Sequence, residues 1–124
     1  MKTLKLYTAI LFSLFTITAA TAQTKTENIK VWGSCGMCKA KIEKAAKGAG
    51  AAQATWSEET LQLAVSYDAT KTSSQKIQQS IAKVGYDTQD FIATNIAYKK
   101  LPGCCQYDRK HAPAMAVDSA VVKQ

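Results

Sequence analysis

The stretch that decides the fold runs from residue 29 to residue 48 and reads IKVWGSCGMCKAKIEKAAKG. Its first four residues are typical of a short strand, which ends at Gly33. Apolar residues then recur at the helical spacing i, i+4, i+7 and i+8. They are Cys38, Ile42, Ala45 and Ala46. Gly48 and Gly50 mark the end of this helix. We therefore predict a strand, a loop and a helix, with a C-x-x-C motif where the helix begins.

The next segments predict a hairpin. Residues 51–56 and 61–67 each alternate apolar with polar side chains, as half-buried strands do. In the first of them we expect Ala52, Ala54 and Trp56 to share the buried face. A turn at residues 57–60 joins the two strands.

A second helix and a last strand follow. Thr72 and Gln75 have the spacing of a capping box, and Ile77, Ile81 and Val84 form the apolar stripe of a helix that ends at Gly85. Residues 86–91 are predicted as a strand. The order βαββαβ is typical of the ferredoxin-like α+β fold, in which one antiparallel four-stranded sheet carries two helices on one face.

The chain divides into three predicted parts. Residues 1–22 have two early lysines, an apolar run and the small residues Ala20-Thr21-Ala22, which is the pattern of a secretory signal peptide cleaved after Ala22. Residues 23–91 form the ferredoxin-like domain. Residues 92–124 form a C-terminal extension with a Cys-Cys pair and a tail without readable periodicity. We expect an exported protein, periplasmic or otherwise secreted, that is not embedded in a membrane after cleavage.

Composition narrows the function. The 124 residues carry 16 Lys+Arg against 9 Asp+Glu, but the lysines are dispersed and export removes nucleic acid as a partner. His111 is the single histidine, so no Ser/His/Asp set can be assembled, and the carboxylates show no paired placement. We therefore expect a protein that is not an enzyme.

The four cysteines point to metal chemistry. Cys35 lies in the loop and Cys38 in the first helical turn, where free N–H groups and the helix dipole favour negative charge. Two thiolates three residues apart can approach one ion from opposite sides, in the near-linear geometry that Cu(I) and Hg(II) accept. A structural disulfide between Cys35 and Cys38 is the alternative.

The βαββαβ order and a C-x-x-C motif across the first loop and helix resemble the heavy-metal-associated domain family, over residues 28–91. The resemblance implies that Cys35 and Cys38 bind the metal. This chain departs from the usual Gly-Met-Thr-Cys-x-x-Cys, because Ser34 alone stands where Met and Thr would be. The resemblance also implies an aromatic residue near the metal after the second helix, which is Tyr86; the alternative is a plain aromatic at the start of a strand.

Cys104 and Cys105 are additional candidate ligands. One of them could fold back as a third ligand for the Cys35 and Cys38 site, or the pair could form a second site with His111. The alternatives are a vicinal disulfide or free thiols. A closed four-thiolate zinc site is also chemically allowed.

A thiol–disulfide oxidoreductase is the rival function, because residues 32–39 also resemble the thioredoxin-type Trp-Cys-Gly-x-Cys-Lys. Against it, too few residues precede Cys35 for the strand and helix of that fold. We expect a carrier of a soft ion, Cu(I) first, with Hg(II) or Zn(II) as alternatives, or sequestration of those metals. Its partner would be a metal-transporting membrane protein or another acceptor with an acidic docking surface, facing Lys39 and Lys41. We expect a monomer, with a metal-bridged dimer as the alternative.

Overall fold

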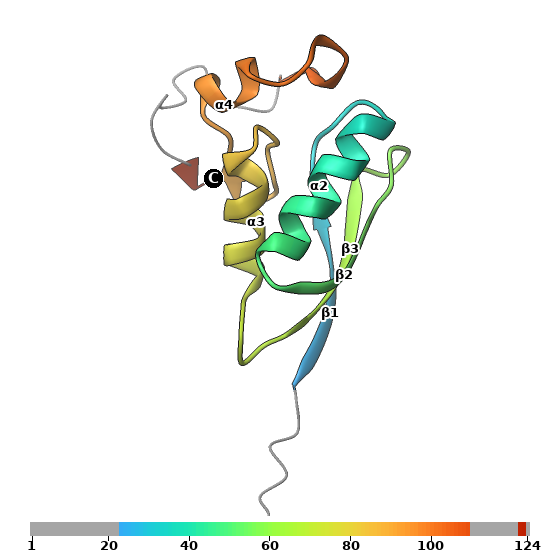
Figure 1. Cartoon of the computed structure of the whole chain (residues 1–124), viewed down its shortest axis with the longest axis vertical. Helices are drawn as coiled ribbons and strands as arrows, with labels where there is room; N and C mark the ends of the chain where they lie inside the picture. The colour runs from blue at the N-terminus through green and yellow to red at the C-terminus, as the bar shows by residue number, and fades with distance from the viewer. Residues whose placement is uncertain (1–22, 110–121, 124) are drawn as a thin grey trace, which may run out of the picture.

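The computed structural model describes residues 23–109 and 122–123 (Figure 1). Its elements are β1 (Thr24–Lys30), α2 (Gly36–Gly48), β2 (Ala51–Trp56), β3 (Gln62–Asp68), α3 (Ser74–Lys83), β4 (Phe91–Ile92), α4 (Asn95–Lys99), the 3₁₀ turn η1 (Gly103–Cys105) and β5 (Val122–Lys123). The predicted order of strand, helix, two strands and helix is confirmed over the first five elements.

The main sheet is antiparallel, with β3 between β1 and β2. The predicted hairpin is present, and Trp56 of β2 lies opposite Leu63 of β3. The expected alternation fails at the start of β2, where the register shifts between Ala51 and Gln53. Because a bulge moves the preceding side chain to the other face, Ala51 is buried and Ala52 is exposed.

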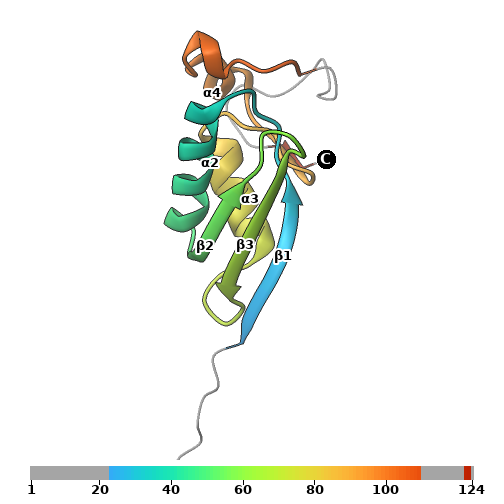
Figure 2. The same cartoon turned by 90° about the vertical axis from the view of Figure 1, so that its right-hand side faces the viewer.

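Both long helices cover one face of this sheet, as predicted (Figure 2). The core between helices and sheet includes fully buried side chains from each layer. They include Ile29, Ile42, Leu63, Ile77 and Ile81. Burial of aliphatic side chains of this size contributes about 1.5–3 kcal/mol each, so this layer holds α2 and α3 in place.

The second helix begins differently from the prediction. Its N-cap is Ser73, whose hydroxyl accepts a hydrogen bond from the backbone N–H of Lys76. The capping box expected at Thr72 is therefore wrong: the Thr72 hydroxyl donates instead to the carbonyl of Ala49 and ties α3 to the turn after α2. Val84 is the C-cap and is 43% exposed, so the apolar stripe ends before it.

The predicted fourth strand at residues 86–91 does not join the main sheet, which has three strands in the described part of the chain. A single isolated bridge connects Val31 with Thr88. The backbone N–H of Thr88 donates to the carbonyl of Phe91, the backbone N–H of Phe91 donates to the Thr88 hydroxyl, and this turn bends the chain away before a longer ladder forms. β4 pairs instead with β5.

Beyond β4 the chain folds back over the end of the domain where α2 begins (Figures 1 and 2). Leu101, Cys105 and Tyr107 belong to the same hydrophobic core as the sheet and helices. Arg109 attaches the end of this segment to the domain, because its guanidinium forms a salt bridge with the fully buried carboxylate of Asp87. The residues after β4 are thus packed on the domain as far as residue 109.

Some predictions concern other parts of the chain. The leader at residues 1–22, His111 and most of the tail lie outside the described residues. Within the described residues, every helix is too short or too polar to cross a membrane.

Candidate metal centre

Two of the predicted ligands lie at the start of α2. Cys35 is the N-cap residue, and its carbonyl accepts the backbone N–H groups of Cys38 and Lys39. Cys38 is in the first turn and is fully buried. The two sulfur atoms are 3.5 Å apart. The loop-and-first-turn placement expected from the sequence is therefore present, and no disulfide joins these two thiols in the structure.

A third thiol reaches this pair from the C-terminal segment. The sulfur of Cys105, a fully buried residue, is 3.9 Å from the sulfur of Cys35. The sulfur atoms of Cys35, Cys38 and Cys105 all lie within 4.8 Å of one another, which suits a metal ion. Cys104 is exposed and is not part of this group. The fold thus brings together three of the four predicted thiols and turns the fourth outward.

Tyr107 holds Cys105 in the core. The Tyr107 hydroxyl accepts the backbone N–H of Asp87 at 2.7 Å and donates to the carbonyl of Gly85 at 3.0 Å. The rings of Tyr107 and Tyr86 stack with centroids 6.0 Å apart. These contacts attach the residues after η1 to the loop after α3, so the position of Cys105 depends on packing rather than on local sequence.

The thiols differ in acidity. Burial by itself acts to raise the pKa of Cys38, but hydrogen bonds from Ser34, Cys105 and Cys35 outweigh it and lower the pKa from 9.0 to about 7. Burial, and then contact with Cys38, raise the pKa of Cys105 from 9.0 to about 12. Cys38 is thus the more acidic thiol of this pair, and Cys105 is the thiol that donates to it.

Tyr86 lies beside the thiols of Cys38 and Cys105. It is fully buried, and burial, followed by contact with the thiols of Cys38 and Cys105, raises its pKa. Among the described residues, no group offers its hydroxyl a hydrogen bond of good geometry. An unsatisfied buried hydroxyl costs free energy. The Tyr86 hydroxyl is such a group, and it lies beside the thiols of Cys38 and Cys105.

Sequence reasoning missed how the loop before α2 meets the second cysteine pair. The Ser34 hydroxyl donates to the carbonyl of Cys104 at 2.7 Å, across 70 positions of sequence. The Cys104 thiol lies 3.6 Å from the Met37 sulfur. A Cys-Cys pair after Pro102 marks an unusual segment, but no local pattern indicates which loop it contacts.

Lys39, which the sequence predicts as a docking residue, also forms contacts within the domain. Its ammonium group pairs with the carboxylate of Glu43 and donates to the carbonyl of Trp56 at 2.9 Å. Glu43 also accepts the backbone N–H of Trp56. Lys39 therefore fastens α2 to β2, while 44% of its side chain remains exposed.

Comparisons with known proteins agree with this geometry. A model of the heavy-metal-associated domain family matches residues 34–87. The crystal structure of oxidized MerP from Ralstonia metallidurans CH34 is 32% identical, with a TM-score of 0.51, over 53% of this chain and 94% of that chain. The solution structure of a putative copper-ion-binding protein from Bacillus anthracis str. Ames is 27% identical, with a TM-score of 0.52, over 56% of this chain and 100% of that chain.

A CopZ metallochaperone is 33% identical over 52% of this chain and 98% of that chain, with a TM-score of 0.49. No curated protein matches the chain. The family match and the likeness to MerP over nearly its whole length show that this chain belongs to the heavy-metal-associated domain family. Its fold is the ferredoxin-like α+β fold of that family, with a three-stranded main sheet in the described residues, and its cysteine cluster could hold a metal ion.

Proposed function

We propose that the protein is an exported carrier of Cu(I), which is held by Cys35, Cys38 and Cys105 and passed to a partner by ligand exchange. The observation that carries this proposal is the cluster of three sulfur atoms within 4.8 Å of one another. Soft thiolate ligands favour Cu(I), Hg(II) and Zn(II) over hard cations. The proposed transfer moves an ion without making or breaking a covalent bond in the protein, so it needs no catalysis.

The sulfur spacing favours three ligands over two. A metal–sulfur distance of about 2.3 Å places three sulfurs around one ion roughly 4.0 Å apart, and two sulfurs across a linear ion roughly 4.6 Å apart. The measured separations are 3.5 Å for Cys35 with Cys38 and 3.9 Å for Cys35 with Cys105. The near-linear pair expected from the sequence would require Cys35 and Cys38 to move apart, whereas a trigonal site requires little movement.

The number of sulfur ligands in the cluster disfavours zinc. A structural Zn(II) site takes four ligands in a tetrahedron, and the fourth thiol, Cys104, is directed to Met37. Cu(I) accepts three thiolates, and the buried surroundings of Cys38 and Cys105 shield the ion from water. The N-terminus of α2 adds a favourable positive dipole beside the thiolates.

Transfer would begin at Cys35. This residue is half-buried, while its neighbours Ser34, Gly36 and Met37 are exposed. A partner thiolate can therefore reach the ion from the side of this loop. It adds to the ion as one of the three protein sulfurs leaves, and each further exchange shifts the ion to the partner.

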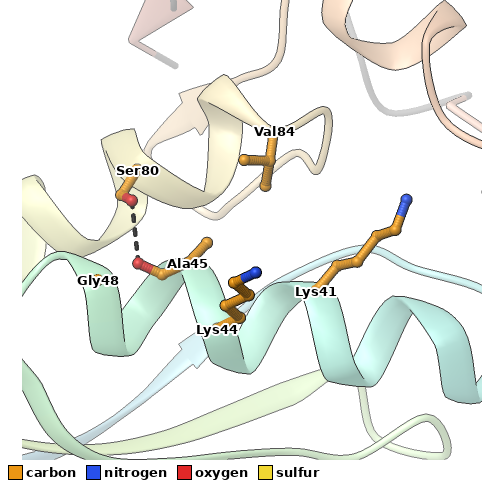
Figure 3. Close-up of a pocket in the computed structure, with 6 residues that line it drawn as sticks. All are labelled: Lys41, Lys44, Ala45, Gly48, Ser80 and Val84. Carbon is orange, nitrogen blue, oxygen red and sulfur yellow. Dashed lines mark hydrogen bonds between the residues drawn. The ribbon is translucent and has the colours of Figure 1, made fainter.

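The partner would present an acidic surface to α2. Lys41 and Lys44 line a shallow hollow between α2 and α3, together with Ser80 and Val84 (Figure 3). Lys41 remains a docking candidate as expected from the sequence, and Lys44 joins it, whereas Lys39 is paired within the domain. A metal-transporting membrane protein with acidic residues near its own cysteines fits this surface. We also propose that the free protein is a monomer.

Export is part of the proposal. The sequence of residues 1–22 has the pattern of a signal peptide with cleavage after Ala22. N-terminal sequencing of the protein recovered from the periplasm or the medium should begin at Gln23. A protein retained in the cytoplasm with Met1 intact would contradict export without affecting the metal site.

The decisive experiment is an anaerobic Cu(I) titration of reduced residues 23–124 against a competing chelator. We expect one tightly bound ion, loss of that site in Cys35→Ser/Cys38→Ser, and affinity lower by about tenfold or more, or 1.4 kcal/mol, in Cys105→Ser. Cys104→Ser is the matched control, because it removes the adjacent exposed thiol and should leave the first ion unaffected.

X-ray absorption of the one-to-one complex counts the sulfur ligands directly. Three sulfurs in the native chain and two in Cys105→Ser are expected. Two sulfurs in both would reject Cys105 as a ligand. Weak Cu(I) binding with catalytic reduction of insulin disulfides that requires Cys35 would favour the oxidoreductase instead.

A further inference from the structure

A second pair of sulfur atoms lies outside the three-thiol cluster. The Cys104 thiol, in η1, is 3.6 Å from the thioether sulfur of Met37, in the first turn of α2. Both residues are exposed, and Met37 exposes 54% of its surface. The thioether is therefore accessible to solvent beside a free thiol.

The fold holds this pair in place from both sides. The hydroxyl of Ser34 donates to the carbonyl of Cys104 at 2.7 Å and fastens η1 to the loop before α2. The backbone N–H of Cys105 donates to the carbonyl of Pro102 at 2.8 Å and closes the 3₁₀ turn. Because Cys105 faces the core, this turn directs the neighbouring Cys104 outward, towards Met37.

We propose that Cys104 and Met37 form an outer binding site for a soft monovalent ion, Cu(I) or its analogue Ag(I), through which the ion enters and leaves the three-thiol site. This inference rests on the proposed carrier function. A thiolate and a thioether are both soft ligands, which bind Cu(I) and exclude hard cations such as Mg²⁺ and Ca²⁺. Because the thioether is neutral, the outer site binds more weakly than three cysteines, as an exchange site must.

The two sites are connected by sulfur. Cys104 lies 3.9 Å from Cys105, and Cys105 lies 3.9 Å from Cys35. An ion on the outer pair can bond to the Cys105 sulfur, which releases its proton to solvent, while the Met37 thioether dissociates. Cys35 then replaces Cys104: the Cys35 thiol releases its proton as its sulfur binds, and the departing Cys104 thiolate takes up a proton. Binding of the Cys38 sulfur completes the three-thiol site. The oxidation state of the ion stays the same throughout, and the ion keeps at least one sulfur ligand at each step.

The test is a titration of the reduced, metal-free protein with Ag(I), which avoids oxidation, followed by NMR of the carbon-13-labelled methionine methyl groups. The first equivalent should fill the three-thiol site with little effect on Met37. The second equivalent should shift the Met37 methyl resonance, while the Met115 resonance serves as the internal reference. Met37→Leu and Cys104→Ser should each weaken the second ion by about tenfold or more and leave the first unchanged.

Leucine is similar to methionine in size and Met37 is exposed, so Met37→Leu should keep the fold. A second equivalent bound equally well by Met37→Leu, or a Met37 resonance that stays in place through two equivalents, overturns the outer site. The proposed carrier function is judged separately by the first equivalent, which must disappear in Cys35→Ser/Cys38→Ser. A Met37 shift that persists in that variant supports the outer site even if the inner one fails.

Discussion

Replacing Arg109 by alanine tests how the segment that carries Cys105 is held on the domain. The Arg109 guanidinium donates to both carboxylate oxygens of Asp87, each at 2.9 Å, and also to the carbonyl of Ala93 at 2.7 Å. The Asp87 side chain is 0% exposed, and that of Arg109 is 12% exposed. The change would therefore leave a buried carboxylate without its cation.

The expected loss in the free energy of unfolding is about 3 kcal/mol, the lower end of the range for breaking one side of a buried ion pair. The lower end applies because the backbone N–H of Ala93 still donates to Asp87 in the variant. For a domain of this size, each kcal/mol corresponds to roughly 4–8 °C, so the melting temperature should fall by more than about 10 °C. Metal affinity should fall too, because Cys105 lies on the same segment.

Urea unfolding of the reduced, metal-free protein, followed by circular dichroism, measures this change. Lys99→Ala removes an exposed positive charge from the same segment and should change stability by no more than about 0.5 kcal/mol. Asp87→Asn with Arg109→Ala completes a double-mutant cycle, in which the double variant should lose less than the sum of the single ones. A loss below about 1 kcal/mol for Arg109→Ala, or additive effects in the cycle, would refute the buried-pair reasoning.

Two further predictions concern acidity and backbone. The pKa of Cys38 is lowered from 9.0 to about 7 in the folded protein, so the contribution of this thiol to the free energy of unfolding is complete above pH 9 and is lost as the pH falls through 7. The pKa of Cys105 is raised from 9.0 to about 12, so its contribution is complete below pH 9 and is lost as the pH rises towards 12. A pH titration of thiolate absorbance should show a midpoint near pH 7 in the native protein, and this midpoint should be missing in Cys38→Ser. A native protein without that midpoint would contradict the lowered pKa of Cys38. Gly85→Ala should destabilise the fold by more than about 1 kcal/mol, since Gly85 has a φ of +108° and a Cβ there would lie 2.8 Å from the carbonyl of Ala97. Gly48→Ala, whose Cβ meets nothing within 4 Å, is the control in thermal unfolding.

The sequence determined the features that depend on neighbouring residues. The apolar spacing from Cys38 to Ala46 defines α2, and the alternation from Leu63 to Tyr67 defines β3, because each pattern repeats with the period of its own secondary structure. The C-x-x-C at the start of α2 follows from the same local rule. For this reason the approach of Cys35 to Cys38 was predictable, whereas the family was indicated by the resemblance of the C-x-x-C motif and the element order to the heavy-metal-associated domain.

The fourth strand was not predictable in this way. Residues 86–91 have the composition of a strand, but a tertiary contact decides their pairing. The Thr88 hydroxyl donates to the side chain of Gln78 in α3, and the turn to Phe91 interrupts the ladder with β1. Strand propensity describes how a side chain fits a sheet, and it does not reveal which partner is available.

The completion of the three-thiol cluster likewise depends on the tertiary structure. Cys104 and Cys105 are adjacent in sequence, yet one is exposed beside Met37 and the other is buried beside Cys35. Their roles are separated by the packing of Tyr107 and the other contacts that fold this segment over α2. Cys35 and Cys105 are 70 positions apart, so no periodic pattern connects them, and only the packed core decides which thiol joins the cluster.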